Sequence, residues 1–209
     1  AVATELALAR DPDAVVGVFA ADHIVQDAAA FVATCARAAE VAARRMIVTI
    51  GIPPTHPAPG YGYIRTSAEI AGGARQVEAF AEKADAARAA GFVLDGYLWN
   101  PGNFIFSGKV MREELQAFGP DVLGPSAEAV ALARRDLDFL RLDDDAFARA
   151  RKISIGYAVM ERTKQVVVVP GAFGCRTSAD GRPYGTSRPR TRTATRSRGA
   201  ATFWAARTI

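Results

Sequence analysis

An aspartate and a histidine follow a short apolar run near the start of the chain. Residues 15–21 are mostly β-branched, aromatic or small, and Asp22 and His23 come directly after them. A carboxylate at the carboxyl end of a buried strand suits a hard divalent cation such as Mg²⁺ that bridges to phosphate oxygens. Asp22 is therefore a candidate Mg²⁺ ligand, and its alternative role is to cap the following turn. We expect His23 to support that turn.

Three later segments carry residue types that could bind a sugar phosphate. Gly62 lies in Gly-Tyr-Gly-Tyr and would let a sugar approach the backbone closely. Lys83 could neutralise a phosphate while Glu82 accepts hydrogen bonds from sugar hydroxyls. Asn100, after a tryptophan, could bind another hydroxyl. The alternatives are a tight turn, a solvated ion pair and an aromatic turn, and the chain has no G-x-x-x-x-G-K-[ST] phosphate loop.

The histidines and cysteines do not suggest a metal or disulfide framework. His23 and His56, with Cys35 and Cys175, lack the close spacing of zinc ligands. Two cysteines are too few for a disulfide scaffold, so we expect a reducing cytoplasm. His56 lies between prolines and is expected in a solvated loop.

Alternating strand and helix patterns must position these residues. Apolar residues at helical spacing follow Asp27, which is a plausible N-cap, and Gly91 would close a short helix. The alternation predicts an α/β sandwich with a largely parallel sheet. The predicted strand segments are 15–21, 46–52, 60–64, 76–83 and 165–170, and 97–106 is expected to form a strand and a turn. The predicted helices are 27–45, 85–90, 109–118, 126–140 and 155–162.

Composition indicates one globular domain and a basic tail. The chain has 209 residues, of which 50% are hydrophobic and 23% are charged, which allows a sizeable core. Its longest apolar run is far shorter than the roughly 20 residues of a membrane helix, and no signal-peptide pattern is present. The net charge of +4 comes from residues 171–209, which hold eight arginines and one acid, whereas residues 1–170 carry a net charge of −3.

The basic tail allows a nucleic-acid-binding interpretation. It is rich in Arg, Thr, Ser and Gly, without apolar periodicity, and its composition is typical of disorder. Few aromatic residues are interleaved with the arginines, and the body of the chain has no known nucleic-acid-binding motif. We therefore expect no nucleic-acid partner, and no membrane partner.

Taken in order, the motifs resemble the mannose-1-phosphate guanylyltransferase family of sugar nucleotidyltransferases over residues 1 to about 175. The family pattern reads P-A-D-H, G-I-x-P-T, G-Y-G-Y-I, F-x-E-K-P, W-N-S-G-M-F and S-I-D-Y-A-V-M-E. The matching segments here are A-D-H at 21–23, G-I-P-P-T at 51–55, G-Y-G-Y-I at 60–64, F-A-E-K at 80–83, W-N-P-G-N-F at 99–104 and S-I-G-Y-A-V-M-E at 154–161.

The resemblance implies a fold, a reaction and roles for the candidate residues. The fold would be a Rossmann-like nucleotidyltransferase domain of the GT-A type, with a mixed, mostly parallel sheet. GTP and mannose 1-phosphate would form GDP-mannose and pyrophosphate in the cytoplasm, with no organic cofactor. Asp22 would hold Mg²⁺, Lys83 would meet the sugar phosphate, and Gly62, Glu82 and Asn100 would shape the mannose site. A homodimer is compatible with this resemblance.

The chain departs from the family pattern at several points. Ala84 replaces a proline, Pro101 and Asn103 replace serine and methionine, and Gly156 replaces an aspartate. The G-G-x-G-T-R-L-W-P nucleotide loop does not occur, so we expect a domain incomplete at its N-terminus and inactive as written. A non-catalytic homologue that binds sugar nucleotides is the alternative.

A second missing motif predicts a change of reading frame. The family has D-V-G-S-W after the strand at 165–170, and its aspartate is the second metal ligand. Here Cys175 is followed by Arg-Thr-Ser. Codons chosen for residues 176–187 can encode D-V-G-R-W in a shifted frame, and one base lost from a serine codon after Cys175 would suffice. The sequence therefore predicts a partial nucleotidyltransferase domain at 1–175 and a frameshifted or disordered tail at 176–209.

Overall fold

Two buried strands form the centre of the sheet in the computed structural model, which describes residues 1–59, 61–81 and 84–177. They are β3 (Ile47–Gly51) and β10 (Val166–Pro170), and they pair in parallel, with Ile47 opposite Val166. All of β3 and most of β10 are buried. Such continuous runs are typical of strands that are covered on both faces.

The remaining strands make the sheet mixed, and most neighbours are antiparallel. The order is β1-β7-β3-β10-β5-β4-β6, and β3 with β10 is the one parallel pair among the described strands of this sheet. The expected largely parallel pairing was therefore wrong. β4 and β5 form an antiparallel hairpin that turns at Gly72 and Gly73, both with positive φ, and β7 inserts antiparallel between β1 and β3. The added strands are β1 (Val15–Val18), β4 (Gly62–Ile70), β5 (Ala74–Ala81), β6 (Leu98–Asn100) and β7 (Phe104–Ser107).

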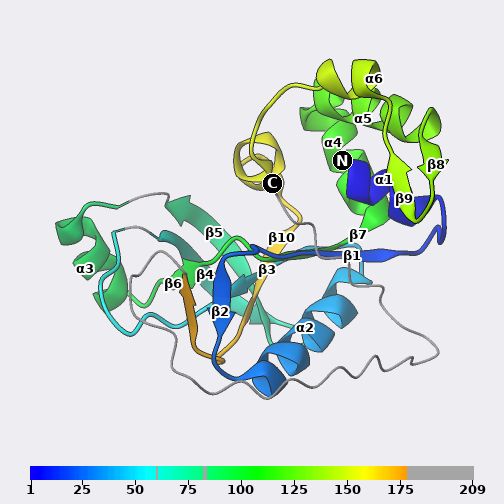
Figure 1. The fold of residues 1–209 in the computed structure, drawn as a ribbon. Helices are drawn as coiled ribbons and strands as arrows, with labels where there is room; N and C mark the ends of the chain where they lie inside the picture. The colour runs from blue at the N-terminus through cyan, green and yellow to red at the C-terminus, as the bar shows by residue number, and fades with distance from the viewer. Residues whose placement is uncertain (60, 82–83, 178–209) are drawn as a thin grey trace.

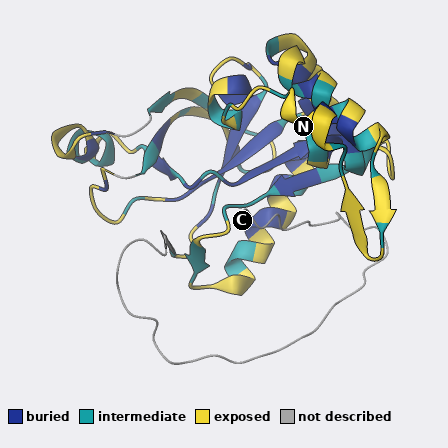
Figure 2. Ribbon diagram, turned by 45° about the horizontal axis from the view of Figure 1, so that its top comes forward, coloured by how far each residue is buried: buried dark blue, intermediate teal, exposed yellow. Residues whose placement is uncertain are grey.

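Helices cover the two faces of the sheet (Figures 1 and 2). On one face α2 (Ala28–Ala42) packs its buried residues against β3, β7 and β10. It begins where the sequence predicts, because the Asp27 carboxylate accepts a 2.9 Å hydrogen bond from Ala30 N. The other face carries α4 (Gly108–Phe118), α5 (Pro120–Ala131) and a π-helix, η1 (Gly156–Met160).

The helix α3 (Ala86–Leu94) does not end at Gly91, as the sequence suggested. The residue in the C′ position is Gly96, whose φ is +74°. Tyr97 N donates to Phe92 O at 3.0 Å, and Gly96 N donates to Val93 O at 3.3 Å. The Phe92 and Tyr97 rings stack 4.5 Å apart. These are the bonds and the apolar contact of a Schellman motif, which explains why the helix ends later.

Replacing Gly91 with alanine is expected to stabilise the protein by about 0.5–1 kcal/mol, because a helix-interior glycine loses more conformational freedom on folding than alanine. A Cβ at Gly91 would meet nothing within 4 Å. Gly96→Ala is the matched control: its Cβ also has open space, but the positive φ makes alanine unfavourable by about 1 kcal/mol. Urea unfolding should show midpoint shifts of opposite sign, and equal shifts would contradict this account.

A helix predicted over 126–140 was also misplaced. α5 begins at Pro120, which is allowed in the first turn, and Pro125 lies inside it. Pro125 cannot donate to Asp121 O, and that carbonyl instead accepts a 3.3 Å bond from Arg151 N. Beyond α5 the chain forms a hairpin, because Leu137 adopts a positive φ of 54°. Its strands, and the short helix after it, are β8 (Arg134–Asp136), β9 (Phe139–Arg141) and α6 (Asp144–Ala148).

Two small elements complete the described fold. The helix α1 (Val2–Leu8), which the sequence analysis missed, packs on α4 and α5. The strands β2 (His23–Val25) and β11 (Cys175–Thr177) pair antiparallel and lie side by side in Figure 1. Thr177 lies opposite His23 in this register. The segment that follows Asp22 thus lies against the segment that begins at Cys175.

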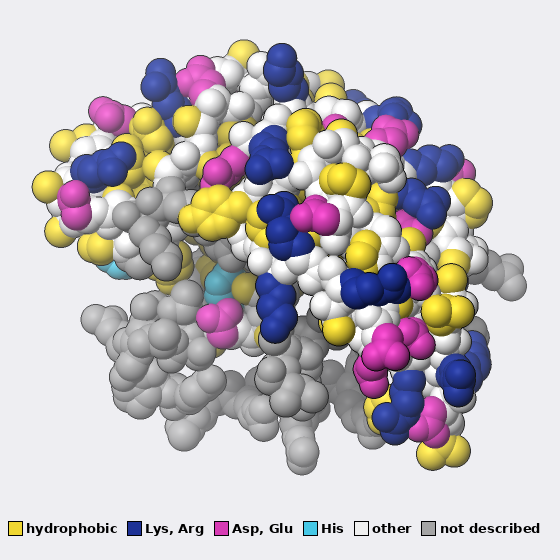
Figure 3. All heavy atoms as spheres, turned by 90° about the horizontal axis from the view of Figure 1, so that it is seen from above, with side chains coloured by type: hydrophobic (Ala, Val, Ile, Leu, Met, Phe, Trp, Pro, Cys, Tyr) yellow, Lys and Arg dark blue, Asp and Glu magenta, His cyan; other side chains and the backbone are white. Residues whose placement is uncertain are grey.

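The surface carries charges of both signs. Figure 3 shows acidic and basic side chains interspersed over one face. Arg149 pairs with Glu128 at 2.6 Å and Arg151 with Asp121 at 2.8 Å. This face of the described residues therefore forms no continuous basic surface of the kind that nucleic acids favour, and a nucleic-acid role would have to rest on the tail, which lies outside the described residues.

In the part of the chain that the structure describes, none of the helices combines the length and the apolar character needed to cross a membrane.

Candidate functional site

A cavity of about 360 Å³ opens where β4 and β6 meet η1. It brings together two of the predicted sugar-binding residues, Gly62 and Asn100, with the segment 154–161. Its volume lies within the range of small-molecule sites. We call it the Asn100 pocket, and its lining residues are Gly62, Phe80, Asn100, Pro101, Gly102, Phe104, Ser154, Ile155, Gly156, Met160 and Glu161.

Hydrogen bonds fix which end of the Asn100 amide can reach a ligand. The Oδ1 atom of Asn100 accepts a bond from Thr49 Oγ1 at 3.2 Å and another from Gly102 N at 3.2 Å. Gly102 N–H can only donate, so the Asn100 oxygen must face it, and no bond from Nδ2 to another described residue is seen. Asn100 can therefore donate to an acceptor such as a sugar hydroxyl oxygen.

Gly62 leaves the space beside this amide open. β4 and β6 pair with Gly62 directly opposite Asn100. A Cβ at Gly62 would lie 3.5 Å from Asn100 Cβ and 3.9 Å from Asn100 Nδ2. A methyl group there would fit, but it would cover the amide. Glycine at this position therefore gives a ligand access to the Asn100 amide, and it is not needed for a turn.

The two remaining sugar-site candidates, Glu82 and Lys83, lie outside the described residues. The last described residue of β5, Ala81, pairs with Tyr63, and its carbonyl oxygen is 3.7 Å from the Cβ position of Gly62. The chain therefore arrives beside the Asn100 pocket immediately before Glu82. Their roles stay predictions.

The π-helix η1 closes the other side of the pocket. Glu161 N donates to Gly156 O at 3.1 Å, which is an i→i+5 bond. This wider turn presents both Gly156 and Glu161 to the pocket. Isolated π-helical turns occur frequently at functional sites. Glu161 adds a carboxylate that the sequence analysis noted only as part of a motif, and such a group can accept bonds from sugar hydroxyls.

Asp22 lies in the turn between β1 and β2, where its carboxylate is exposed. His23 Nε2 is 4.0 Å from Asp22 Oδ1, which is too long for a hydrogen bond. Burial lowers the pKa of His23, and the Asp22 charge opposes this in part, so His23 stays neutral at neutral pH. Within the described ranges no donor bonds to the Asp22 carboxylate, and the cap of the next helix is Asp27. The alternative role of Asp22, capping the following turn, therefore finds no support among the described residues.

Among the described residues, no group of three or more His, Cys, Asp or Glu side chains could hold a metal. Mg²⁺ is commonly bound by one or two carboxylates together with substrate phosphates. The exposed Asp22 carboxylate fits such a shared site, but it does not make a site by itself. Burial raises the pKa of the Cys35 thiol to about 11, which makes that cysteine a poor ligand and nucleophile at neutral pH.

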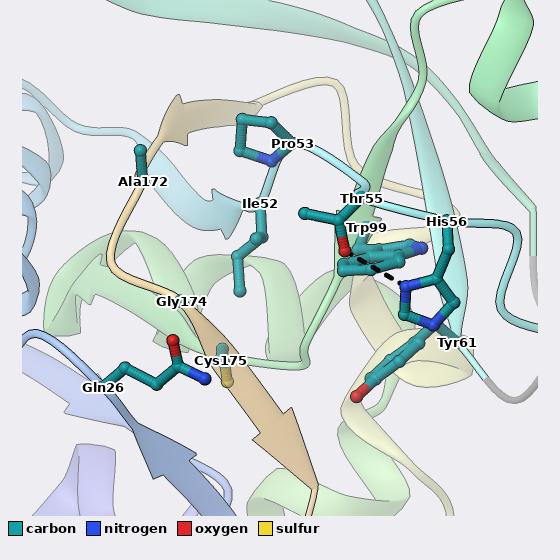
Figure 4. Close-up of a pocket in the computed structure, with 10 residues that line it drawn as sticks. All are labelled: Gln26, Ile52, Pro53, Thr55, His56, Tyr61, Trp99, Ala172, Gly174 and Cys175. Carbon is teal, nitrogen blue, oxygen red and sulfur yellow. Dashed lines mark hydrogen bonds between the residues drawn. The ribbon is translucent and has the colours of Figure 1, made fainter.

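A larger cavity of about 850 Å³ is lined by Trp99, the residue before Asn100 (Figure 4). Trp99 and Asn100 are consecutive strand residues, so their side chains point to opposite faces. Tyr61 stacks on Trp99 with ring centroids 5.0 Å apart, and His56 packs edge-on against Trp99 at 5.1 Å. Figure 4 shows these three rings grouped on one side, with Gln26 and Cys175 on the other.

This aromatic grouping differs from the sequence prediction for His56. The residue is exposed, as expected for a loop, but Thr55 Oγ1 and His56 Nδ1 are 3.1 Å apart and the ring contacts Trp99. The remaining lining residues are Ile52, Pro53, Ala172 and Gly174.

Comparison with known proteins identifies the family. The family described as nucleotidyl transferase matches residues 1–143. This chain belongs to the nucleotidyl transferase family. Among its relatives, the xanthan biosynthesis protein XanB of Xanthomonas campestris is 44% identical over 171 residues, which is 81% of this chain and 36% of that protein. The mannose-1-phosphate guanylyltransferase RfbM of Salmonella typhimurium is 40% identical over 79% of this chain and 35% of its own length.

Solved structures agree with this family assignment. A Thermus thermophilus protein described as a mannose-1-phosphate geranyltransferase superposes with a TM-score of 0.73 and 31% identity, and covers 83% of this chain and 49% of that one. A Helicobacter pylori protein described as a mannose-6-phosphate isomerase gives a TM-score of 0.69 at 25% identity. The family resemblance and the α/β fold of the nucleotidyltransferases, predicted from the motifs, are confirmed. The chain spans about a third of the length of the curated relatives it matches.

Proposed function

We propose that the Asn100 pocket binds mannose 1-phosphate, as the sugar-phosphate half of a mannose-1-phosphate guanylyltransferase. The observation that carries the proposal is the Asn100 amide, whose oxygen is held by Thr49 and Gly102 and which lines a small cavity together with Gly62. Asn100 would donate to a sugar hydroxyl, and Glu161 would accept from another. Relatives named for this activity match 77–79% of the chain at 40% identity.

The proposed reaction transfers a nucleotidyl group to the sugar phosphate. A phosphate oxygen of mannose 1-phosphate forms a bond to the α-phosphorus of GTP, and the bond from that phosphorus to the bridging oxygen of the β-phosphate breaks. GDP-mannose forms and pyrophosphate leaves with the electron pair. The residues contribute by positioning and by neutralising charge. Lys83 would meet the sugar phosphate, and Glu82 would bind hydroxyls beside Gly62.

We propose Asp22 as the ligand of Mg²⁺ carried by the nucleotide. Bound Mg²⁺ would neutralise phosphate charge during the transfer. We expect this chain to bind the sugar phosphate. GTP and sugar phosphates are cytoplasmic metabolites, so we propose the cytoplasm as its location.

Substituting Asn100 tests the proposal. Asn100→Ala is expected to raise the Kd for mannose 1-phosphate about five- to tenfold, the worth of one hydrogen bond. Asn100→Asp should weaken binding at least as much, because a carboxylate can keep the bonds from Thr49 and Gly102 but cannot donate to the sugar. Isothermal titration of the full chain measures both. Ser67→Ala, at an exposed position further along β4, is the control.

Specific outcomes would reject the assignment. An unchanged Kd in Asn100→Asp would remove the sugar from this pocket. Tight binding of GDP-mannose without any affinity for mannose 1-phosphate would favour the non-catalytic homologue. A salt-dependent shift of RNA or DNA that disappears on deletion of residues 176–209 would favour the nucleic-acid interpretation.

A further inference from the structure

Asn103 is a buried polar residue at the start of β7, and its exposed fraction is 2%. β7 lies between β1 and β3, and Phe104, its first residue, pairs with both, opposite Val18 and Thr49. At Asn103 the chain turns away toward β6. Asn103 nevertheless continues the hydrogen bonding on both sides of β7. Its backbone oxygen accepts a bond from Ile50 N at 3.1 Å, and its Oδ1 atom accepts a bond from Ala20 N at 3.1 Å.

Thr49 extends this connection to the sugar pocket. Its side chain is fully buried in β3. The hydroxyl lies 3.2 Å from Asn100 Oδ1 and 3.4 Å from Asn103 O, and it donates to one of them at a time. Through these bonds the strand that leads to Asp22, the turn at 100–103 and the Asn100 amide form one continuous network.

We propose that Asn103 and Thr49 are positioning residues that hold the Asn100 amide in its ligand-binding orientation. The inference rests on the sugar-phosphate role proposed for Asn100. Asn103 joins the turn that carries Asn100 to Ala20, two residues before Asp22, and Thr49 holds the oxygen of the Asn100 amide so that Nδ2 faces the pocket. The turn that carries Asn100 is thereby held in a fixed position relative to the chain that leads to Asp22.

Asn103 gives this chain a connection that the family pattern does not provide. The pattern has methionine at this position. A methionine would keep the backbone bond to Ile50, but its thioether is at best a weak acceptor for Ala20 N–H. Asn103→Met therefore removes the bond from Ala20 N and introduces the residue of the family pattern.

A double-mutant cycle tests whether the network acts through Asn100. In the chain that keeps Asn100, Asn103→Met and Thr49→Val should each raise the Kd for mannose 1-phosphate about three- to tenfold. Thr49→Ser keeps the hydroxyl, so its Kd should stay within about twofold of that of the unmodified chain. In the Asn100→Ala background the first two substitutions should change the Kd little. Equal losses in both backgrounds would show a general structural role and overturn the proposal.

Amide hydrogen exchange in the ligand-free chain gives a second readout. Gly102 N–H bonds to Asn100 Oδ1 and so reports the amide orientation. Asn103→Met should expose the Ala20 amide, leave Ile50 protected and speed exchange at Gly102 about tenfold, and Thr49→Val should also speed exchange at Gly102. Unchanged protection of Gly102 in both variants would overturn the proposal.

The two readouts separate the inference from the function on which it rests. If the unmodified chain binds no mannose 1-phosphate while Gly102 protection depends on Thr49 and Asn103, the proposed function fails and the positioning network stands. If binding requires Asn100 but neither substitution affects it, the function stands and the network has no role in it.

Discussion

A carboxylate at position 177 is expected to raise the affinity of this chain for Mn²⁺, used as a probe for Mg²⁺, about tenfold or more. β2 and β11 pair with Thr177 opposite His23, on the strand adjacent to the one that follows Asp22. Thr177→Asp would therefore add a carboxylate on the strand opposite His23, the residue that follows Asp22. Affinity for hard cations rises with the number of charged oxygen ligands. Titration followed by electron paramagnetic resonance measures the free Mn²⁺.

Two further variants make this experiment decisive. Thr177→Asn has nearly the size of aspartate without the charge, and it should leave Mn²⁺ binding unchanged. Asp22→Asn should abolish the gain in the Thr177→Asp chain, because the proposed site needs both carboxylates. A gain in Thr177→Asp that persists after Asp22→Asn would place the cation elsewhere and reject Asp22 as a ligand.

The same position links the metal site to the frameshift hypothesis. If one base was lost from a serine codon after Cys175, the restored frame reads serine and then aspartate, which puts the aspartate at 177. The pairing of β2 with β11 is an independent observation, and it places residue 177 opposite His23, which follows Asp22. Resequencing the gene across codon 175 should reveal one additional base. An unchanged sequence would sink the hypothesis while leaving the Thr177→Asp experiment valid.

Local signals in the sequence predicted most elements of the fold. Asp27 identified the start of α2 because its side chain caps the helix. The buried run that contains Ile47 predicted β3. The errors arose where the deciding interaction lies outside the local pattern. Gly91 has the residue type of a helix end, but the helix continues to Leu94, where the apolar contact between Phe92 and Tyr97 accompanies Gly96 in the C′ position.

Strand direction was the least predictable property. Alternating strands and helices usually give parallel sheets, and nothing in the composition of β7 shows that it inserts between β1 and β3. That placement depends on the turn at 100–103 and on which strands are adjacent in three dimensions. Pairing over such separations is set by the whole sheet rather than by any one segment.

The candidate site was predicted in part. Gly62 and Asn100 were expected to serve one ligand, and the structure brings them to the same pocket with residues 154–161. Thr49 and Asn103 were not candidates for the sugar site, because a threonine inside an apolar strand and a departure from a family motif carry no signal of their own. Their role becomes visible only when hydrogen-bond partners are known. Glu82 and Lys83 lie outside the described residues and stay predictions.

Truncating Phe173 to alanine is expected to destabilise the chain by about 3–5 kcal/mol, the usual cost of removing a buried phenylalanine. Phe173 is 1% exposed and packs edge-on against Phe31 of α2 with ring centroids 5.1 Å apart. A Cβ at Gly171 would lie only 2.6 Å from its ring, so the packing around it is tight. Total stabilities are typically about 5–15 kcal/mol, so urea unfolding should show a large fall in the midpoint.

Phe147→Ala is the matched control, because this side chain on α6 is 49% exposed. We expect it to shift stability by less than about 1 kcal/mol. Phe173→Ala should also loosen the junction beside Asp22, since Phe173 O accepts a 3.0 Å bond from Asp27 N and Gly174 O accepts a 2.9 Å bond from Gln26 N. Amide exchange at these two donors should rise in the remaining native state. Comparable unfolding midpoints for the two variants would contradict the placement of Phe173 in the core. They would also contradict the expectation that Phe173 stabilises the junction beside the β2–β11 pair.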